Sequence, residues 1–85
     1  MDLKKIYGAV VRRERVAKGV SIEALAHDAG LSYSYFDSME LGKRNPSLRV
    51  IFAVADALGV EADQMVREVA QQLAAQPDEK ASARR

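Results

Sequence analysis

Residues 21–48 read SIEALAHDAGLSYSYFDSMELGKRNPSL, and this stretch predicts two short helices joined by a tight turn. Ser21 and Ser32 stand where a hydroxyl oxygen can accept a hydrogen bond from a free amide at the start of a helix. Gly30 stands where the first helix ends, because glycine adopts the left-handed backbone conformation at little cost. The expected helices are residues 22–29 and 33–41, and the turn is 30–32. This pattern is the helix-turn-helix arrangement.

The sequence on either side extends this pair to an all-α, five-helix bundle. Apolar residues recur there at three- and four-residue spacing, as they do on one face of a helix. Gly19 and Gly59 supply helix ends, and Ser47 supplies a further start. The three further helices are expected at residues 3–18, 48–58 and about 61–75. Residues 1–75 form the predicted domain, and residues 76–85 are predicted to be a flexible polar tail.

Composition excludes several classes of protein. The chain of 85 residues has no cysteine and a single histidine, which leaves too few ligands for a structural zinc site. It contains no nucleophile–base pairing, phosphate-binding glycine loop or cofactor motif, so we expect no catalytic residue, no metal, no cofactor and no enzyme activity. With no long apolar run and no signal peptide, we expect a cytoplasmic, nucleoid-associated protein with no membrane partner.

Charge is distributed unevenly along the chain. Residues 1–50 hold nine Lys and Arg against six acids, whereas residues 51–85 hold four against six. This asymmetry favours an anionic partner on the N-terminal side.

The second helix of the pair carries polar chemistry on its outer face. Phe36 and Met39 are expected to point inward. The outward residues are Tyr33, Ser34, Asp37 and Ser38. Hydroxyl, carboxylate and aromatic groups of this kind can contact base edges or phosphates. The alternative is an ordinary polar surface, since helix pairs with glycine turns are common in small α proteins.

A wider set of residues has a joint spacing that is typical of one family. The set comprises Arg15, Gly19, Ser21, Leu25, Ala26, residues 30–32, Glu40, GKRNPSL at 42–48 and ALGV at 57–60. It resembles the Cro and phage-repressor class of helix-turn-helix domains, also called XRE-like, over roughly residues 6–66. The resemblance implies a bundle that binds palindromic operator DNA as a homodimer, with its third helix in the major groove.

The resemblance also implies roles for particular residues. Its base-reading positions fall on Tyr33, Ser34 and Ser38, with Asp37 beside them. Its phosphate-contacting positions fall on Ser21, Ile22, Tyr35, Lys43, Arg44 and Asn45. Its internal ion pair falls on Arg15 and Glu40.

This sequence departs from the family pattern at three places. Ile22 replaces the usual glutamine at the head of the second helix, and Glu14 stands where an apolar residue is more usual. The reading face lacks Gln and Arg, so we expect single hydrogen bonds, contacts with thymine methyl groups or water-mediated contacts, and partial readout of DNA shape.

The fourth helix carries more apolar residues than one core face needs. Leu48, Ile51, Ala55 and Leu58 are expected to face the core, which leaves further apolar side chains on other faces. Together with the fifth helix these predict a dimer interface. Its expected residues are Val50, Phe52, Val54, Val66, Val69 and Leu73. The alternative is that the fifth helix covers the fourth within one chain.

Taken together, these features favour a dimeric, sequence-specific DNA-binding transcriptional regulator, acting as a repressor or autoregulator. The alternative from another class is a protein-interaction module, such as an antitoxin bound to its toxin or to another regulator, in which DNA binding is secondary.

Overall fold

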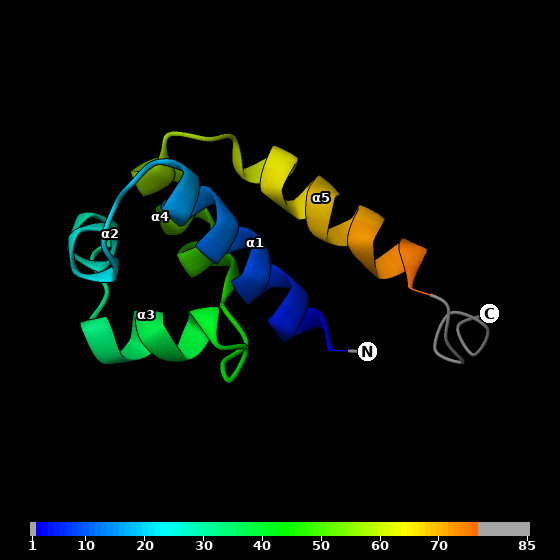
Figure 1. Cartoon of the computed structure of the whole chain (residues 1–85), viewed down its shortest axis with the longest axis horizontal. Coiled ribbons are helices and arrows are strands. Elements are labelled where there is room, and N and C mark those ends of the chain that lie inside the picture. Colours follow the sequence, from blue (N-terminus) through cyan, green and yellow to red (C-terminus); the bar gives the residue numbers. More distant parts are fainter. Residues whose placement is uncertain (1, 77–85) are drawn as a thin grey trace.

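The computed structural model describes residues 2–76 as five α-helices with no strand among those residues (Figure 1). The helices are α1 (Leu3–Ala17), α2 (Ile22–Ala29), α3 (Tyr33–Glu40), α4 (Leu48–Leu58) and α5 (Ala62–Ala75). The all-α prediction is confirmed. Three helix ends differ by one residue from the prediction, because Lys18 and Leu41 are C-caps and Glu61 is an extended N-cap. The predicted tail lies outside the described residues, apart from Gln76, which ends α5.

Serine side chains start the three central helices. The hydroxyl oxygens of Ser21, Ser32 and Ser47 accept hydrogen bonds from backbone amides three residues on, at 3.0, 3.1 and 3.2 Å. Gly30 and Gly59 end α2 and α4 in the left-handed conformation, each with φ +74°. These caps satisfy backbone groups that a helix end would otherwise leave free, and they fix where each helix begins and ends.

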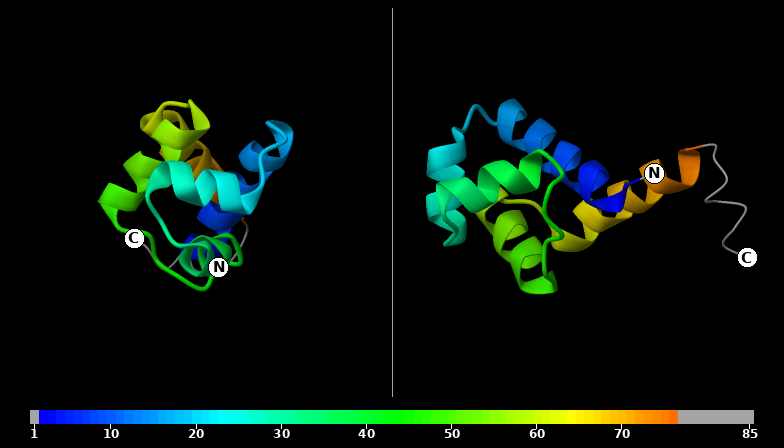
Figure 2. Two further views of the ribbon diagram at one scale, coloured as in Figure 1. Left: turned by 90° about the vertical axis from the view of Figure 1, so that its left-hand side faces the viewer. Right: turned by 90° about the horizontal axis from the view of Figure 1, so that it is seen from below.

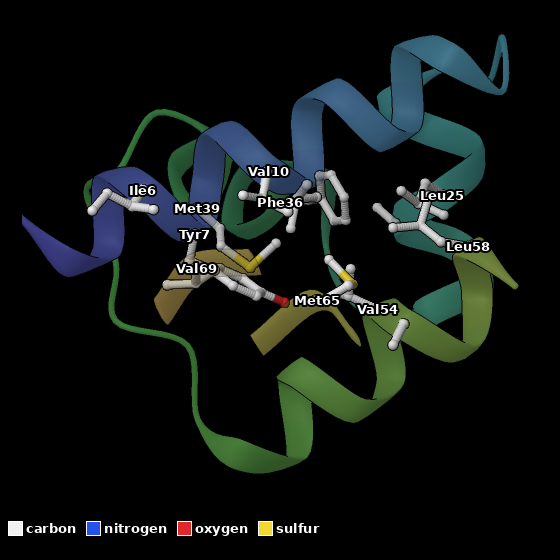
Figure 3. Close-up of a cluster of buried hydrophobic side chains, with 13 residues drawn as sticks. Ile6, Tyr7, Val10, Leu25, Phe36, Met39, Val54, Leu58, Met65 and Val69 are labelled. Atoms are coloured by element: carbon white, nitrogen blue, oxygen red, sulfur yellow. The ribbon is translucent and has the colours of Figure 1, made fainter. Parts of the chain in front are cut away.

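The five helices pack around one core. α1 packs against α3 and α5, and α2 packs against α3 and α4, so that α2 and α3 form one end of the molecule (Figures 1 and 2). Thirteen buried hydrophobic residues fill the interior, with Phe36 of α3 between α1 and the other helices (Figure 3). Phe36 and Met39 are fully buried, as predicted.

Gly8 allows α1 to approach α3 at backbone distance. A Cβ atom at this position would collide with the carbonyl oxygens of Met39 and Glu40 at the end of α3. Glycine in the middle of a helix normally lowers stability, so its presence here reflects this close contact. This contact is not among the features predicted from the sequence.

The buried face of α4 differs from the prediction. Val54 is fully buried, together with Ala55 and Leu58, whereas Leu48 is 70% exposed. α5 lies along α1 and also contacts α4, which buries Val69 in the core of the same chain. The prediction that Leu48 faces the core is therefore wrong, and so is the placement of Val54 and Val69 in a dimer interface.

Candidate nucleic-acid interface

The outer face of α3 presents the predicted reading residues to solvent. Tyr33 is 53% exposed and Ser34 is also exposed, while Asp37 and Ser38 are half-buried. Because Phe36 and Met39 fix the opposite face in the core, the orientation of α3 is determined by packing. The outward residues are therefore held on a rigid helix at one edge of the molecule (Figure 1).

An ion pair joins α1 to the end of α3. The Arg15 guanidinium donates from Nε to Glu40 Oε2 at 2.7 Å and from Nη2 to Glu40 Oε1 at 3.1 Å. Its Nη1 donates to the carbonyl oxygen of Val20 at 2.9 Å, in the turn before α2. The carboxylate of Glu40 raises the pKa of Arg15, against the opposing effect of burial. The pair that the resemblance implies is present, and it fixes the relative position of three segments.

The start of α2 offers amide groups rather than a positive side chain. The Ser21 hydroxyl oxygen accepts a hydrogen bond from the Ala24 amide at 3.0 Å, which leaves its O–H available as a donor. The helix also leaves the N–H groups of Ile22 and Glu23 without intrahelical acceptors. The Ile22 side chain is half-buried against the core. Any contact of Ile22 with a phosphate therefore uses its main-chain amide, and helix N-termini suit anions for this reason.

The loop after α3 carries two exposed cations. Lys43, Arg44 and Asn45 are all exposed. The loop leaves α3 through hydrogen bonds from Gly42 N to Met39 O at 3.0 Å and from Lys43 N to Ser38 O at 2.9 Å. Gly42 has φ +78°, and a side chain there would also collide with Lys5. The loop path is therefore fixed at its first residue.

Arg44 and Tyr35 are in contact. The Cζ atom of Arg44 lies 5.4 Å from the centre of the Tyr35 ring, within the range of a cation–π interaction. The resemblance gives each residue a separate phosphate contact, and nothing in their spacing across the loop indicates that they would stack.

Two surface cavities adjoin these residues. Asp37 lines a hollow of about 260 Å³ with Arg12, Arg15 and Ile22, and its carboxylate makes no hydrogen bond within residues 2–76. Asn45 lines a separate apolar groove of about 270 Å³ between α1, α4 and α5. Asn45 therefore borders two regions of the surface, the loop and this groove.

Residues 2–76 contain neither a cluster of metal ligands nor a membrane-spanning helix. No group of three or more His, Cys, Asp or Glu residues within 2–76 is placed to hold a metal ion. None of the helices there is long and apolar enough to cross a membrane. What the geometry defines is a helix-turn-helix unit of the DNA-binding class, with α3 as its outward helix.

Comparisons with known proteins identify the family. Residues 11–65 match the helix-turn-helix family. The HTH-type transcriptional regulator y4dJ of Sinorhizobium fredii is 36% identical over 66 residues, which cover 78% of this chain and 86% of that protein. The crystal structure of the clp gene regulator ClgR from C. glutamicum has a TM-score of 0.81 at 30% identity, covering 89% of this chain and 99% of that one.

A second solved structure is more similar in sequence. The restriction-modification controller protein C.AhdI from Aeromonas hydrophila is 40% identical with a TM-score of 0.71, covering 73% of this chain and 94% of that one. The chain belongs to the XRE-type helix-turn-helix family of DNA-binding transcriptional regulators, which are not enzymes.

Proposed function

We propose that the protein binds a palindromic DNA operator as a homodimer, with α3 in the major groove, and regulates transcription as a repressor or autoregulator. The observation that carries this proposal is the two-faced α3, with Phe36 and Met39 fully buried and Tyr33 and Ser34 exposed on the other side. A helix presented in this way enters the major groove in helix-turn-helix proteins.

The contacts divide into two kinds. Tyr33, Ser34, Asp37 and Ser38 contact base edges, and the absence of Gln and Arg among them favours single hydrogen bonds, water-mediated contacts and shape readout. The phosphate contacts come from the α2 start at Ser21 and Ile22, from Tyr35, and from the loop residues Lys43, Arg44 and Asn45. These contacts set the register on the duplex, and the base contacts set the preferred sequence.

A second protomer docks on the apolar surface of α4 and α5. Phe52 is 58% exposed and Val66 is 45% exposed, while Val50 and Leu73 are half-buried beside the core. Large apolar side chains that remain exposed on a helix favour an interface. In such a dimer, two reading helices about 34 Å apart would fit successive major grooves. The proposed interface is therefore Val50, Phe52, Val66 and Leu73.

The relatives support a regulatory role. ClgR is named a clp gene regulator and C.AhdI a restriction-modification controller. A regulator of this kind acts in the cytoplasm, on nucleoid DNA. The same apolar surface of α4 and α5 would also suit a protein partner such as a toxin or another regulator, so the assembly state is part of the test.

Selection of bound fragments from genomic DNA, followed by sequencing, tests the proposal. The wild type is expected to enrich a palindromic site, and Ser38→Ala is expected to change the preference at one or two positions per half-site by about 1 kcal/mol. Arg44→Ala is expected to weaken specific and nonspecific DNA about equally and to reduce the salt dependence of binding. Arg67→Ala, on the exposed side of α5, is the matched control, and it should leave the sequence preference and the affinity for DNA unchanged.

Two results would contradict the proposal. Recovery of the wild-type sequence preference from Tyr33→Ala, Ser34→Ala and Ser38→Ala variants alike would exclude α3 as the reading helix. Sedimentation of the wild type as a 9.3 kDa monomer that still binds a palindrome tightly would exclude the homodimer.

A further inference from the structure

We propose that Tyr35 is a positioning residue for Arg44: its ring holds the guanidinium in place before DNA arrives. The inference rests on the proposed function, because Arg44 matters through its contact with phosphate. It assigns the effect of Tyr35 to its ring face, whereas the family resemblance gives it only a direct contact with the DNA backbone.

The Tyr35 ring is a fixed platform. The residue is half-buried and packs against the hydrophobic core, and its backbone N–H donates to the Ser32 cap at 3.1 Å. Its phenol also lies close enough to the buried Tyr7 to add to the effect of burial, which raises the pKa of Tyr7. Core packing thus fixes the ring that the guanidinium covers.

Arg44 itself has no other anchor among the described residues. It is exposed, it lies in the loop between Gly42 and Pro46, and no hydrogen bond or ion pair of its side chain occurs within residues 2–76. A long side chain in such a loop would lose rotamer freedom when it meets a phosphate. The cation–π contact with Tyr35 removes part of that loss in advance.

The contact with Tyr35 leaves the guanidinium able to bind an anion, because its N–H groups donate to no acceptor within residues 2–76. A guanidinium stacks through its planar face, and its N–H groups point outward in the plane, where they can donate to two phosphate oxygens at once. Lys43, the neighbouring exposed cation, has no aromatic partner among residues 2–76. The two cations of the loop therefore differ in how their side chains are held, and only Arg44 is preorganised by an aromatic ring.

Binding to a random-sequence duplex tests this inference, since phosphate contacts do not depend on the operator. The affinity loss caused by Arg44→Ala is measured in the wild-type, Tyr35→Phe and Tyr35→Leu backgrounds. Tyr35→Phe keeps the ring, so the loss should equal that in the wild type. In Tyr35→Leu the loss should be smaller by about two- to fivefold, the size of an exposed cation–π interaction. Tyr35→Met replaces Tyr35→Leu if circular dichroism shows that leucine lowers the melting temperature.

A second readout needs no DNA. In NMR spectra of the free protein, the Arg44 side-chain protons should show a ring-current displacement in the wild type and in Tyr35→Phe, and should lose it in Tyr35→Leu. The inference would be overturned if Arg44→Ala caused equal affinity losses in all three backgrounds, or if the Arg44 proton shifts were the same in the wild type and in Tyr35→Leu. DNA binding itself would remain intact in either case. A wild type that shows the displacement but binds no DNA would instead refute the proposed function, and the positioning role with it.

Discussion

The helix-turn-helix unit and the α4–α5 pair are determined by different kinds of information. In α2 and α3, each start is set by a nearby serine and the turn is set by Gly30. In the α4–α5 pair, Ser47 and Gly59 cap α4 in the same way, but α5 begins at Glu61 without a side-chain cap, and its buried face follows from its position along α1. Short-range chemistry therefore fixes the first unit, whereas contacts between distant segments decide which apolar residues of the second remain exposed.

Two aspartate substitutions, one at a buried and one at an exposed apolar position of α4 and α5, test this comparison and give the largest expected difference in stability. Val69→Asp places a charge in the core, where Val69 is 7% exposed, and should lower the free energy of unfolding by about 4 kcal/mol. Phe52→Asp, at a position 58% exposed, should change the stability of the monomer by less than about 0.5 kcal/mol. Urea unfolding followed by circular dichroism measures both. A Val69→Asp variant as stable as the wild type would show that α5 does not pack on α1.

Removal of Glu40 tests whether the helix-turn-helix unit depends on its link to α1. Glu40→Ala leaves the Arg15 guanidinium without its partner at a site where the Glu40 side chain is 4% exposed, so stability should fall by about 3 kcal/mol. Glu23→Ala, an exposed glutamate on α2, is the control and should lower stability by less than about 1 kcal/mol. Equal melting temperatures for the two variants would show that the ion pair contributes nothing.

Gly8 tests the contact between α1 and α3. Alanine is normally the better helix residue, but Gly8→Ala drives a methyl group into backbone carbonyl oxygens and should lower stability by about 2 kcal/mol. At the exposed neighbour the preference is reversed, since Ala9→Gly should lose about 1 kcal/mol through helix propensity alone. A stabilising Gly8→Ala variant would indicate that the two helices are further apart than the structure places them.

The smallest expected change in stability concerns the Arg13–Glu68 ion pair between α1 and α5. Arg13 donates to both carboxylate oxygens of Glu68, one of them at 2.7 Å, and this ion pair lowers the pKa of Glu68. A lowered folded-state pKa stabilises the fold above the unfolded-state pKa, and the contribution is lost as pH falls through the folded value. Glu68→Gln should therefore lower stability at neutral pH by less than about 1 kcal/mol, since the pair is on the surface.

Unfolding at a series of pH values checks this sign. The difference between the wild type and Glu68→Gln should shrink as the pH is lowered into the acid range. A difference that persists unchanged in acid would assign it to packing rather than to charge.

The same contrast explains which features of the structure could be predicted from the sequence. Caps and turns depend on residues a few positions apart, so the bounds of α2 and α4 and the inward face of α3 could be predicted. The exposure of Leu48 and the burial of Val54 depend on how α2 and α5 lie against α4, which no short-range pattern records. The Arg13–Glu68 pair and the cation–π contact of Arg44 with Tyr35 likewise join separate segments, and only the structure reveals them.

The two-faced α3 has a consequence for how binding preference can change. Tyr33 and Ser34 lie outside the buried core, so substitution at these positions leaves the residues that hold α3 untouched. If α3 reads DNA as proposed, new operator sequences are accessible through single exchanges on its outer face with little effect on folding. On the proposed function, the binding preference can change independently of the fold, and substituting the outward residues of a relative into α3 is the direct way to redirect the protein to another operator.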